Sequence, residues 1–313
     1  MSAATHIRFA RYPGESARII FAPLLLALEH GYFRDEGLDV EVFEPSDHPW
    51  QSVAREESQA GVGYIDYCAR PEYYGKFKAV AVHERLSKGR GLPAIMARPA
   101  LLDNGELTDE ASLRGKTLGL TWGRGDDYLT YLFLVLRGGL TFADVKYVPV
   151  PHEGAAREAA LASGAIDVIM GRRPRGVALE EERGVLRRWK VGGEIEESWQ
   201  NRDFIFGTEF MRRSPEAVAA FLRAHQRGVA DYLAGTSTGV PSEAFLPELA
   251  AISSETPALL RDSLPGGFPA DCRIDEVTLA RDLQLMKDVD LFPRALGVAD
   301  VIDQRFAPAI APA

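Results

Sequence analysis

The chain has 313 residues and a net charge of −9, with 46% hydrophobic and 26% charged residues. This length exceeds one core of typical domain size, so we expect two lobes, and the composition is that of an ordinary globular protein. The acidic balance excludes a general electrostatic grip on nucleic acid or an anionic membrane, so an anion site has to be built locally from arginines and backbone amides.

Strand and helix patterns alternate through the first hundred residues. A helix is expected over Ser16–Phe33, with Ser16 as a possible cap. Alternation of apolar and polar residues predicts strands at His6–Arg11, Leu38–Pro45, Gly61–Asp66 and Phe77–Arg85. Strands that alternate with helices imply a parallel sheet covered on both sides.

The middle of the chain repeats this rhythm. Helices are expected at Asp126–Gly138 and Gly154–Gly164. Strands are expected at Gly115–Thr121, Asp144–Val150 and Ala165–Gly171. These elements form a second βαβ lobe.

The second lobe ends where the pattern changes again. Arg202–Phe210 resembles a strand that returns to the first lobe, and the chain is mostly helical from Ser214. We therefore assign residues 1–97 and 205–313 to lobe 1 and residues 98–204 to lobe 2. The two crossings, near 92–98 and 202–207, are expected to form a hinge.

Neither membrane insertion nor a metal centre is expected. The apolar stretch Ile19–Leu28 is about half the ~20 residues that a membrane span needs, and it lacks the layout of a signal peptide. Cys68 and Cys272 lack metal-type spacing, the histidines are scattered, and no cofactor is indicated. The protein as written is expected to be cytoplasmic, or periplasmic if a leader has been removed.

Several segments together resemble a known family. "FAPLLLALEHGYFRDEGLDVEVFE", "SLRGKTLGLTWGRGDDYLTYLFLVLRGGLTFADVKYVPV", "EAALASGAIDVIM" and "VADVIDQRFAPA" resemble, in order and spacing, solute-binding proteins for nitrate, taurine and aliphatic sulfonates. That group includes the NMT-like proteins for thiamine-pyrimidine precursors. The resemblance implies an α/β, two-lobed periplasmic-binding-protein-like (type II) fold with a small-molecule ligand in the cleft between the lobes. It also implies an ABC permease as partner if the protein is exported.

Two departures from this family keep an alternative open. Transport relatives carry an export leader, and the related pyrimidine-precursor synthases carry a cysteine-rich stretch; neither is written here. The fold also hosts cytoplasmic enzymes, including aromatic desulfinases and thiamine-pathway synthases, and a fold does not choose among functions.

In parallel α/β lobes, ligands lie beyond the carboxyl ends of the strands. On lobe 1 this rule selects Glu15, Asp66 and Tyr67 as ligand contacts. On lobe 2 it selects Trp122, Gly123, Arg124, Arg172 and Arg173.

The lobe 2 candidates have both functional and ordinary interpretations. Gly123 would let the backbone approach a ligand at a helix start, whereas Asp126 or Asp127 could simply cap that helix. Trp122 would stack on a ligand. Arg172 and Arg173 could bind a carboxylate, sulfonate or phosphate, or could form a solvated turn.

Cys68 and His83 carry the enzyme alternative. Cys68 is either a buried structural thiol or, beside His83 or an arginine, a nucleophile. His83 is either its base or a satisfied residue on the lobe surface. The first hypothesis is thus a solute-binding protein for a small anionic or aromatic molecule. The alternative is a decarboxylase, desulfinase or other lyase, or a precursor synthase, acting in the same cleft.

Overall fold

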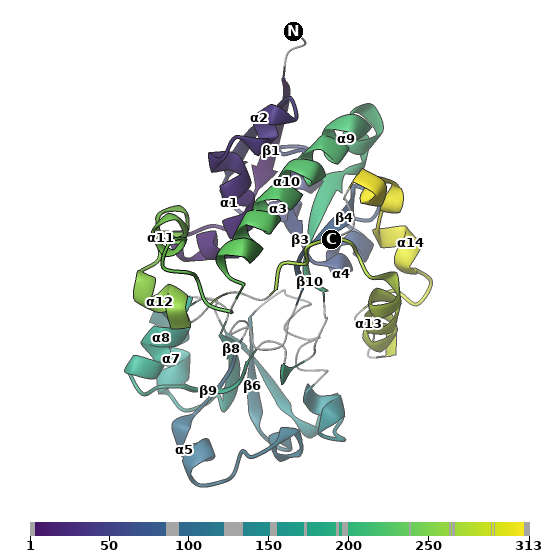
Figure 1. The fold of residues 1–313 in the computed structure, drawn as a ribbon. Coiled ribbons are helices and arrows are strands. Elements are labelled where there is room, and N and C mark those ends of the chain that lie inside the picture. Colours follow the sequence, from purple (N-terminus) through teal and green to yellow (C-terminus); the bar gives the residue numbers. More distant parts are fainter. Residues whose placement is uncertain are drawn as a thin grey trace. The chain divides into compact units, whose positions relative to one another are not determined.

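The computed structural model describes residues 4–85, 94–121, 134–150, 155–171, 174–191, 194–195, 200–237, 239–262, 264, 267–288, 290 and 292–309. The chain divides into two compact units (Figure 1). Unit 1 comprises Met1–Arg85, Ser198–Arg261 and Gly267–Ala313, and unit 2 comprises Leu86–Glu197 and Asp262–Gly266. None of the helices within the described ranges is long and apolar enough to cross a membrane.

Unit 1 is built on a five-stranded sheet in the order β2-β1-β3-β10-β4. Its strands are β1 (Thr5–Ala10), β2 (Leu38–Phe43), β3 (Ala60–Gly63), β4 (Phe77–Arg85) and β10 (Gln200–Gly207). β1 pairs in parallel with β2 and β3, and β10 is antiparallel to both β3 and β4. The central strand β3 is buried along its whole length, as expected for a strand with both faces covered.

The helix expected over Ser16–Phe33 is divided into three pieces. A 3-10 helix η1 (Glu15–Phe21) leads into α1 (Ala22–Glu29), which is followed by α2 (Tyr32–Asp35). Pro23 stands in the first turn of α1, where its missing N–H costs nothing, and Gly31 has a positive φ of 76° between α1 and α2. The residue that precedes η1 as its cap is Gly14, so the expectation that Ser16 caps a helix here is wrong.

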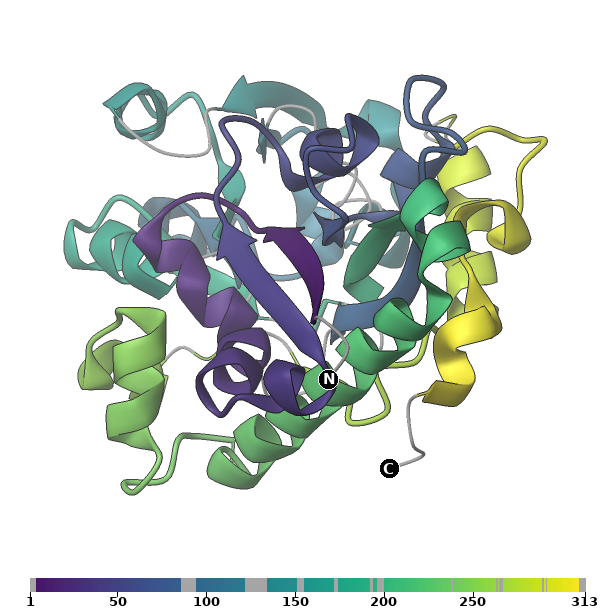
Figure 2. The ribbon, with the colours of Figure 1, turned by 90° about the horizontal axis from the view of Figure 1, so that it is seen from above.

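The remaining helices of unit 1 are connected to the sheet or follow it. They are α3 (Pro49–Ala54), α4 (Ile65–Ala69), α9 (Thr208–Arg213), α10 (Pro215–Gly235), α11 (Leu246–Ser253), α12 (Pro257–Asp262), α13 (Glu276–Asp288), α14 (Val298–Val301) and η5 (Gln304–Ala309). The long helix α10 packs against α1, and Figure 2 shows the two running side by side, green beside purple. Asp66 lies in α4 rather than at the end of the expected strand Gly61–Asp66, because β3 already ends at Gly63.

Unit 2 repeats the sheet arrangement with the order β7-β6-β8-β5-β9. Its strands are β5 (Ala94–Ala97), β6 (Thr117–Thr121), β7 (Lys146–Val150), β8 (Val168–Gly171) and β9 (Arg187–Val191). The described helices are α5 (Pro99–Asp103), η2 (Glu110–Leu113), η3 (Phe142–Asp144), α7 (Ala155–Ala162) and α8 (Pro174–Glu182). β6 is parallel to β7 and β8, and β5 is antiparallel to β8 and β9.

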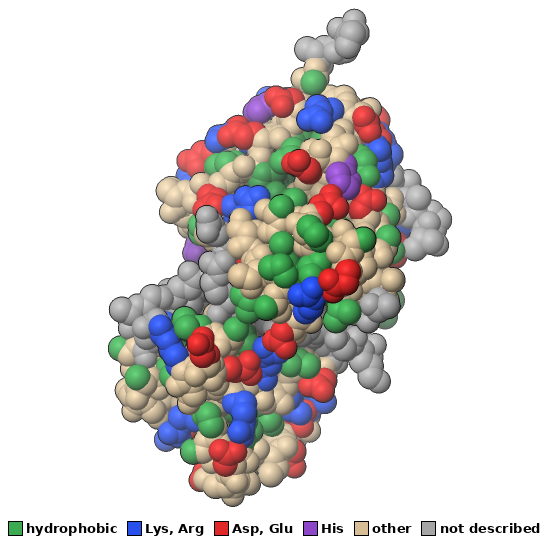
Figure 3. All heavy atoms as spheres, turned by 60° about the vertical axis from the view of Figure 1, so that its left-hand side comes forward, with side chains coloured by type: hydrophobic (Ala, Val, Ile, Leu, Met, Phe, Trp, Pro, Cys, Tyr) green, Lys and Arg blue, Asp and Glu red, His purple; other side chains and the backbone are tan. Residues whose placement is uncertain are grey.

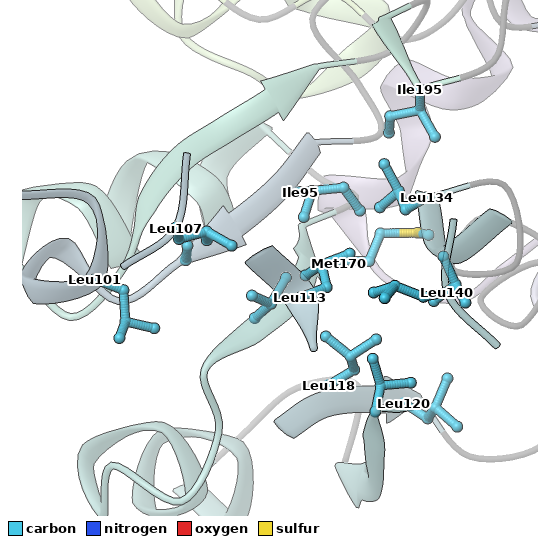
Figure 4. Packing of buried hydrophobic residues seen from close by; sticks show 14 residues of the cluster. Ile95, Leu101, Leu107, Leu113, Leu118, Leu120, Leu134, Leu140, Met170 and Ile195 are labelled. Atoms are coloured by element: carbon cyan, nitrogen blue, oxygen red, sulfur yellow. The ribbon is translucent and has the colours of Figure 1, made fainter. Parts of the chain in front are cut away.

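One face of the unit 2 sheet carries a continuous hydrophobic core. Figure 4 shows Ile95, Leu118 and Met170, from three neighbouring strands, pointing toward leucines of the surrounding segments, among them Leu113 and Leu134. This core explains why the short strand Ala94–Ala97, buried along its whole length, belongs to unit 2.

The crossings between the units differ from the expected boundaries. Ala94–Ala97 pairs with β8 and β9, so it belongs to unit 2 and not to lobe 1 as predicted. Residues 200–204 likewise pair with β3 and β4 of unit 1, whereas they were assigned to lobe 2. The physical reason is that β5 and β10 are the first described strands after the chain passes from one unit to the other, and each pairs with strands of the unit that the chain has entered. The prediction that a strand near Arg202–Phe210 returns to the first unit is confirmed.

Candidate ligand-binding site

The carboxyl ends of three unit 1 strands meet at one edge of the sheet. Arg11 and Tyr12 follow β1 at this edge, Tyr64 follows β3, and Glu84 is the penultimate residue of β4. Because β10 is antiparallel, its amino-terminal residues, beginning near Arg202, lie at the same edge. In parallel α/β sheets this is the edge at which ligands bind.

The loop after β1 is held in shape by Arg11. The Arg11 guanidinium donates to the carbonyl oxygens of Tyr12, at 2.9 Å, and Gly14, at 3.2 Å, and forms an ion pair with Glu44. Gly14 has a φ of 92°, which favours glycine, and its N–H donates to Glu44 Oε2 at 2.9 Å. Burial lowers the pKa of Arg11, and Glu44 opposes that effect. These bonds fix the point at which η1 begins, at Glu15.

Four aromatic side chains gather beside this loop: Tyr12, Trp50, Tyr64 and Tyr67, here called the aromatic cluster. Trp50 stacks on Tyr67 with 4.1 Å between ring centroids and 11° between ring planes. The centroid of the Tyr12 ring lies 6.5 Å from that of Trp50 and 6.3 Å from that of Tyr64. Each of the four is at most 3% exposed, so the cluster is a packed, buried group of aromatic rings at the carboxyl edge of the unit 1 sheet.

Both faces of Tyr67 are occupied. Trp50 covers one side, and the Arg70 guanidinium lies 3.9 Å from the Tyr67 ring centroid. Arg70 also forms an ion pair with Asp66 at 3.1 Å, and His48 stacks on Trp50 at 4.4 Å. Tyr67 and Asp66 thus take part in the packing of the aromatic cluster, and their contact with a ligand stays a prediction.

A buried ion pair lies at the same edge. Arg202 and Glu84 face each other across β10 and β4, and their side chains are 4% and 2% exposed. The Arg202 guanidinium lies 6.0 Å from the Tyr12 ring. Its buried Nε has no hydrogen-bond partner among the described residues. Arg202 thus brings a donor to the edge of the aromatic cluster while Glu84 balances its charge.

Cys68 has the properties of a structural thiol. It is 1% exposed in α4, and burial raises the pKa of the thiol well above its usual value, with the Asp203 and Asp66 carboxyls adding to the effect. Burial likewise raises the pKa of Asp203, against the opposing charge of Arg85. A thiol in this setting is not activated as a nucleophile.

His83 does not lie on the lobe surface as the alternative interpretation had it. It is 1% exposed, its Nε2 is 2.8 Å from the carbonyl oxygen of Ile20, and its ring stacks on Phe21. Burial lowers the pKa of His83 well below its usual value, and the neighbouring His225 and Arg202 add to the effect. His83 is therefore a neutral residue of the unit 1 core.

The other predicted contacts belong to segments without a described placement. Trp122, Gly123, Arg124, Arg172 and Arg173 lie outside the described residues. Glu15 begins η1, but its side chain also lies outside them. These predictions therefore stay predictions.

Sequence reasoning missed part of this edge. Tyr12 lies two residues after the end of β1, so the rule for strand ends could have selected it beside Glu15. Arg202 lies near the start of the antiparallel strand β10, to which a rule about carboxyl ends does not apply. Trp50 reaches the cluster from α3, and only its stacking on Tyr67 reveals that.

The sequence pattern of the NMT1/THI5-like family matches residues 19–236, which is more than half of the chain. The chain belongs to the NMT1/THI5-like family. A curated relative, the riboflavin-binding protein RibY of Chloroflexus aurantiacus, is 25% identical over 228 residues, covering 72% of this chain and 61% of that protein. The match thus spans less than two thirds of the length of this relative.

Solved structures share the fold of this family member. The alkanesulfonate-binding protein SsuA of Xanthomonas axonopodis pv. citri superposes with a TM-score of 0.70 at 15% identity, covering 97% of this chain and all of that one. The ligand-binding component of an ABC-type import system of Staphylococcus aureus has a TM-score of 0.73 at 14% identity, covering 98% and 99%. The desulfurization enzyme DSZB has a TM-score of 0.59 at 16% identity, covering 97% and 98%. The expected periplasmic-binding-protein-like α/β fold is confirmed.

Proposed function

We propose that this NMT1/THI5-like protein is a solute-binding protein whose ligand is a flat aromatic molecule held at the carboxyl edge of the unit 1 sheet. The observation that carries the proposal is the aromatic cluster of Tyr12, Trp50, Tyr64 and Tyr67 at that edge. Aromatic rings bind other flat rings by stacking and edge-to-face contact, in addition to burying apolar area. A related protein is named as a riboflavin binder, which supports the same class of ligand.

Titration with riboflavin tests this proposal. Trp50 lies in the aromatic cluster, so a flat ligand bound there is expected to quench tryptophan fluorescence. Tyr12→Leu removes a ring at the edge of the cluster and is expected to weaken binding about tenfold or more, the loss of roughly one aromatic contact. The matched control is Tyr73→Leu, because Tyr73 packs on Phe77 at 5.9 Å, at the other end of β4. Equal affinities for the two variants would contradict the placement of the site.

We further propose an ABC permease as the partner of the liganded protein. Support comes from the structural similarity to a ligand-binding component of an ABC-type import system. Hinge closure of the two units on the ligand is part of this proposal. The test is whether the riboflavin-loaded protein stimulates ATP hydrolysis by such a permease in proteoliposomes more than the ligand-free protein does.

The enzyme alternative has less support. DSZB shares the fold, but a shared fold does not carry an activity with it. The two side chains on which the alternative relied, Cys68 and His83, are both buried, and their pKa values are shifted away from nucleophile and base. The site residues that the structure describes, all in unit 1, therefore fit a solute-binding role better than an enzymatic one.

A further inference from the structure

The arginines around the aromatic cluster are each matched to a carboxylate. Arg202 pairs with Glu84, and Arg11 pairs with Glu44. Arg70, over the Tyr67 ring, pairs with Asp66 at 3.1 Å. A sulfonate or phosphate site needs the opposite arrangement, with arginine or lysine charge left for the ligand.

Two further arginines of unit 1 lie near this edge but are anchored on other segments. Arg85 donates to the carbonyl oxygen of Arg273 at 2.8 Å and lies near the Asp203 and Asp275 carboxyls. Arg18 donates from Nε to the carbonyl oxygen of Ile252 in α11 at 2.7 Å. Neither forms a contact with the aromatic cluster within the part of the chain that the structure describes.

Stability alone does not explain why Arg202 and Glu84 form an ion pair in a buried position. Removing two charges from water costs so much that a buried ion pair is seldom more stabilising than apolar side chains of similar size. Here the Arg202 Nε is buried and has no hydrogen-bond partner in the described structure, and the guanidinium carbon of Arg202 lies 6.0 Å from the centroid of the Tyr12 ring. A charge-balanced arginine can donate a hydrogen bond to a neutral oxygen or ring nitrogen. An anion at the same place would meet the nearby Glu84 carboxylate, and the two like charges repel each other strongly where little water screens them.

We propose that unit 1 meets its solute with a charge-neutral face, on which Arg202 donates a hydrogen bond to an uncharged acceptor of an aromatic ring system. Glu84 acts as the specificity residue, because its carboxylate disfavours the binding of anionic ring compounds. This inference rests on the proposed function, because it presumes that the ligand reaches the aromatic cluster. The sequence predicted a small anionic or aromatic ligand. With a charge-neutral face, the expected ligand is an aromatic molecule whose ring system carries no charge.

A matched pair of ring compounds tests the inference. Naphthalene-2-sulfonamide and naphthalene-2-sulfonate share the ring and the S=O acceptors, and only the second is an anion. In competition with riboflavin, the sulfonamide is expected to bind at least about tenfold more tightly than the sulfonate. A sulfonate that binds as tightly as the sulfonamide, or a sulfonamide that does not compete, overturns the inference while leaving riboflavin binding intact.

Glu84→Gln tests the residue that carries the charge argument. The variant removes the carboxylate and keeps the side chain's shape, so the preference for the sulfonamide is expected to shrink about tenfold or to reverse. The matched control is Glu180→Gln, which breaks the largely buried Arg157–Glu180 pair of unit 2 and is expected to leave the preference unchanged. An unchanged preference in folded Glu84→Gln overturns the role of Glu84. If that variant does not fold, the wild-type comparison still decides the charge preference.

The experiment separates this inference from the proposed function. If riboflavin does not bind, the proposed riboflavin-like ligand class fails. The two naphthalene compounds are then titrated directly by tryptophan fluorescence, and a preference for the anion counts against the neutral face. If neither compound binds, both the proposed aromatic-solute function and this inference fail.

Discussion

At the residue scale, the two buried histidines of unit 1 are expected to make the fold sensitive to acid. His83 and His225 lie with 6.0 Å between ring centroids in a core that includes Phe204 and Phe221. Neither His225 ring nitrogen has a hydrogen-bond partner in the described structure. Burial lowers the pKa of His225 to about 3. The ring is therefore neutral when the protein is folded at neutral pH.

His225→Leu is expected to reduce the acid sensitivity. The pKa of His225 is about 3 in the folded state and about 6.5 in the unfolded state, so the unfolded state takes up a proton first as the pH falls. The free energy of unfolding is therefore at its full value above pH 6.5 and decreases as the pH falls toward 3. The free energy of unfolding of the wild type should fall with decreasing pH more steeply than that of the variant, by about 1.4 kcal/mol per pH unit. Urea unfolding between about pH 4.5 and 7.5 measures this difference. Parallel slopes for the wild type and His225→Leu would refute the prediction.

The two thiols are expected to resist modification in the folded protein. Cys68 and Cys272 are both free and buried, and burial raises the pKa of Cys272 to about 12. Because the thiolate is the reactive form, a disulfide reagent should label neither residue in native protein and both in denatured protein. Cys68→Ala should bind riboflavin as the wild type does. Rapid native labelling of Cys68, or loss of binding in the variant, would revive the enzyme alternative.

At the element scale, the packing of α10 on α1 depends on one glycine inside a helix. A Cβ added at Gly228 would lie 2.1 Å from the Pro23 carbonyl oxygen and 3.0 Å from Ala27 Cβ. Helix propensity alone would favour alanine at this position, but the backbone of α1 cannot move aside without disturbing the core.

Gly228→Ala is therefore expected to destabilise the protein by about 1–3 kcal/mol, although alanine is the better helix former. Gly176→Ala, in α8, is the matched control, because nothing lies within 4 Å of the added Cβ. That control should be neutral or more stable by about 0.5–1 kcal/mol. Chemical denaturation of both variants decides the matter, and a stabilised Gly228→Ala would show that the helices can separate at little cost.

A histidine also links three helices on the surface of unit 1, where Figure 3 shows acidic and basic side chains interspersed. His30 Nδ1 lies 2.9 Å from Asp231 of α10, and its Nε2 lies 2.7 Å from Glu248 of α11. The Tyr32 hydroxyl of α2 lies 3.2 Å from the same Nδ1 and donates to Asp231. Because both ring nitrogens face carboxylates, both bonds can form only when the ring carries two protons.

Attachment of α11 is therefore expected to weaken as the pH rises. Burial alone would lower the pKa of His30, but the hydrogen bonds to Glu248 and Asp231 outweigh it and raise the pKa. The stabilisation is fully present below the unfolded pKa of about 6.5 and is lost as the pH rises through the raised folded value. Hydrogen exchange of Leu246–Ser253, corrected for intrinsic rates, should be faster near pH 8.5 than near pH 5.5. In His30→Gln this pH effect should be absent, and its persistence there would assign it to another group.

At the scale of the whole molecule, the sheets of the two units have the same strand order, and each contains one antiparallel strand. The orders β2-β1-β3-β10-β4 and β7-β6-β8-β5-β9 correspond strand for strand, with β10 and β5 as the antiparallel members. β5 is the first described strand after the chain passes from unit 1 to unit 2 at Leu86, and β10 begins just after the chain returns to unit 1 at Ser198. We expect the hinge there.

Hinge closure can be measured by small-angle X-ray scattering. If saturating riboflavin binds and favours a closed arrangement of the units, the radius of gyration should decrease, because only a ligand with higher affinity for the closed state shifts that equilibrium. Tyr12→Leu is expected to bind riboflavin more weakly, so this variant should show a smaller change at the same riboflavin concentration. Tight binding without any change in the radius of gyration would contradict hinge closure.

The sequence by itself determined the α/β class, the two-part division and the return of a strand near Arg202–Phe210. These follow from hydrophobic periodicity, which is a local property of the chain. Only the tertiary structure decided that Ala94–Ala97 belongs to unit 2 and that Trp50, Tyr67 and Arg70 form one stack. It also decided that Arg202 is neutralised by Glu84, because pairing and burial bring together residues more than a hundred positions apart, and no local pattern records that proximity.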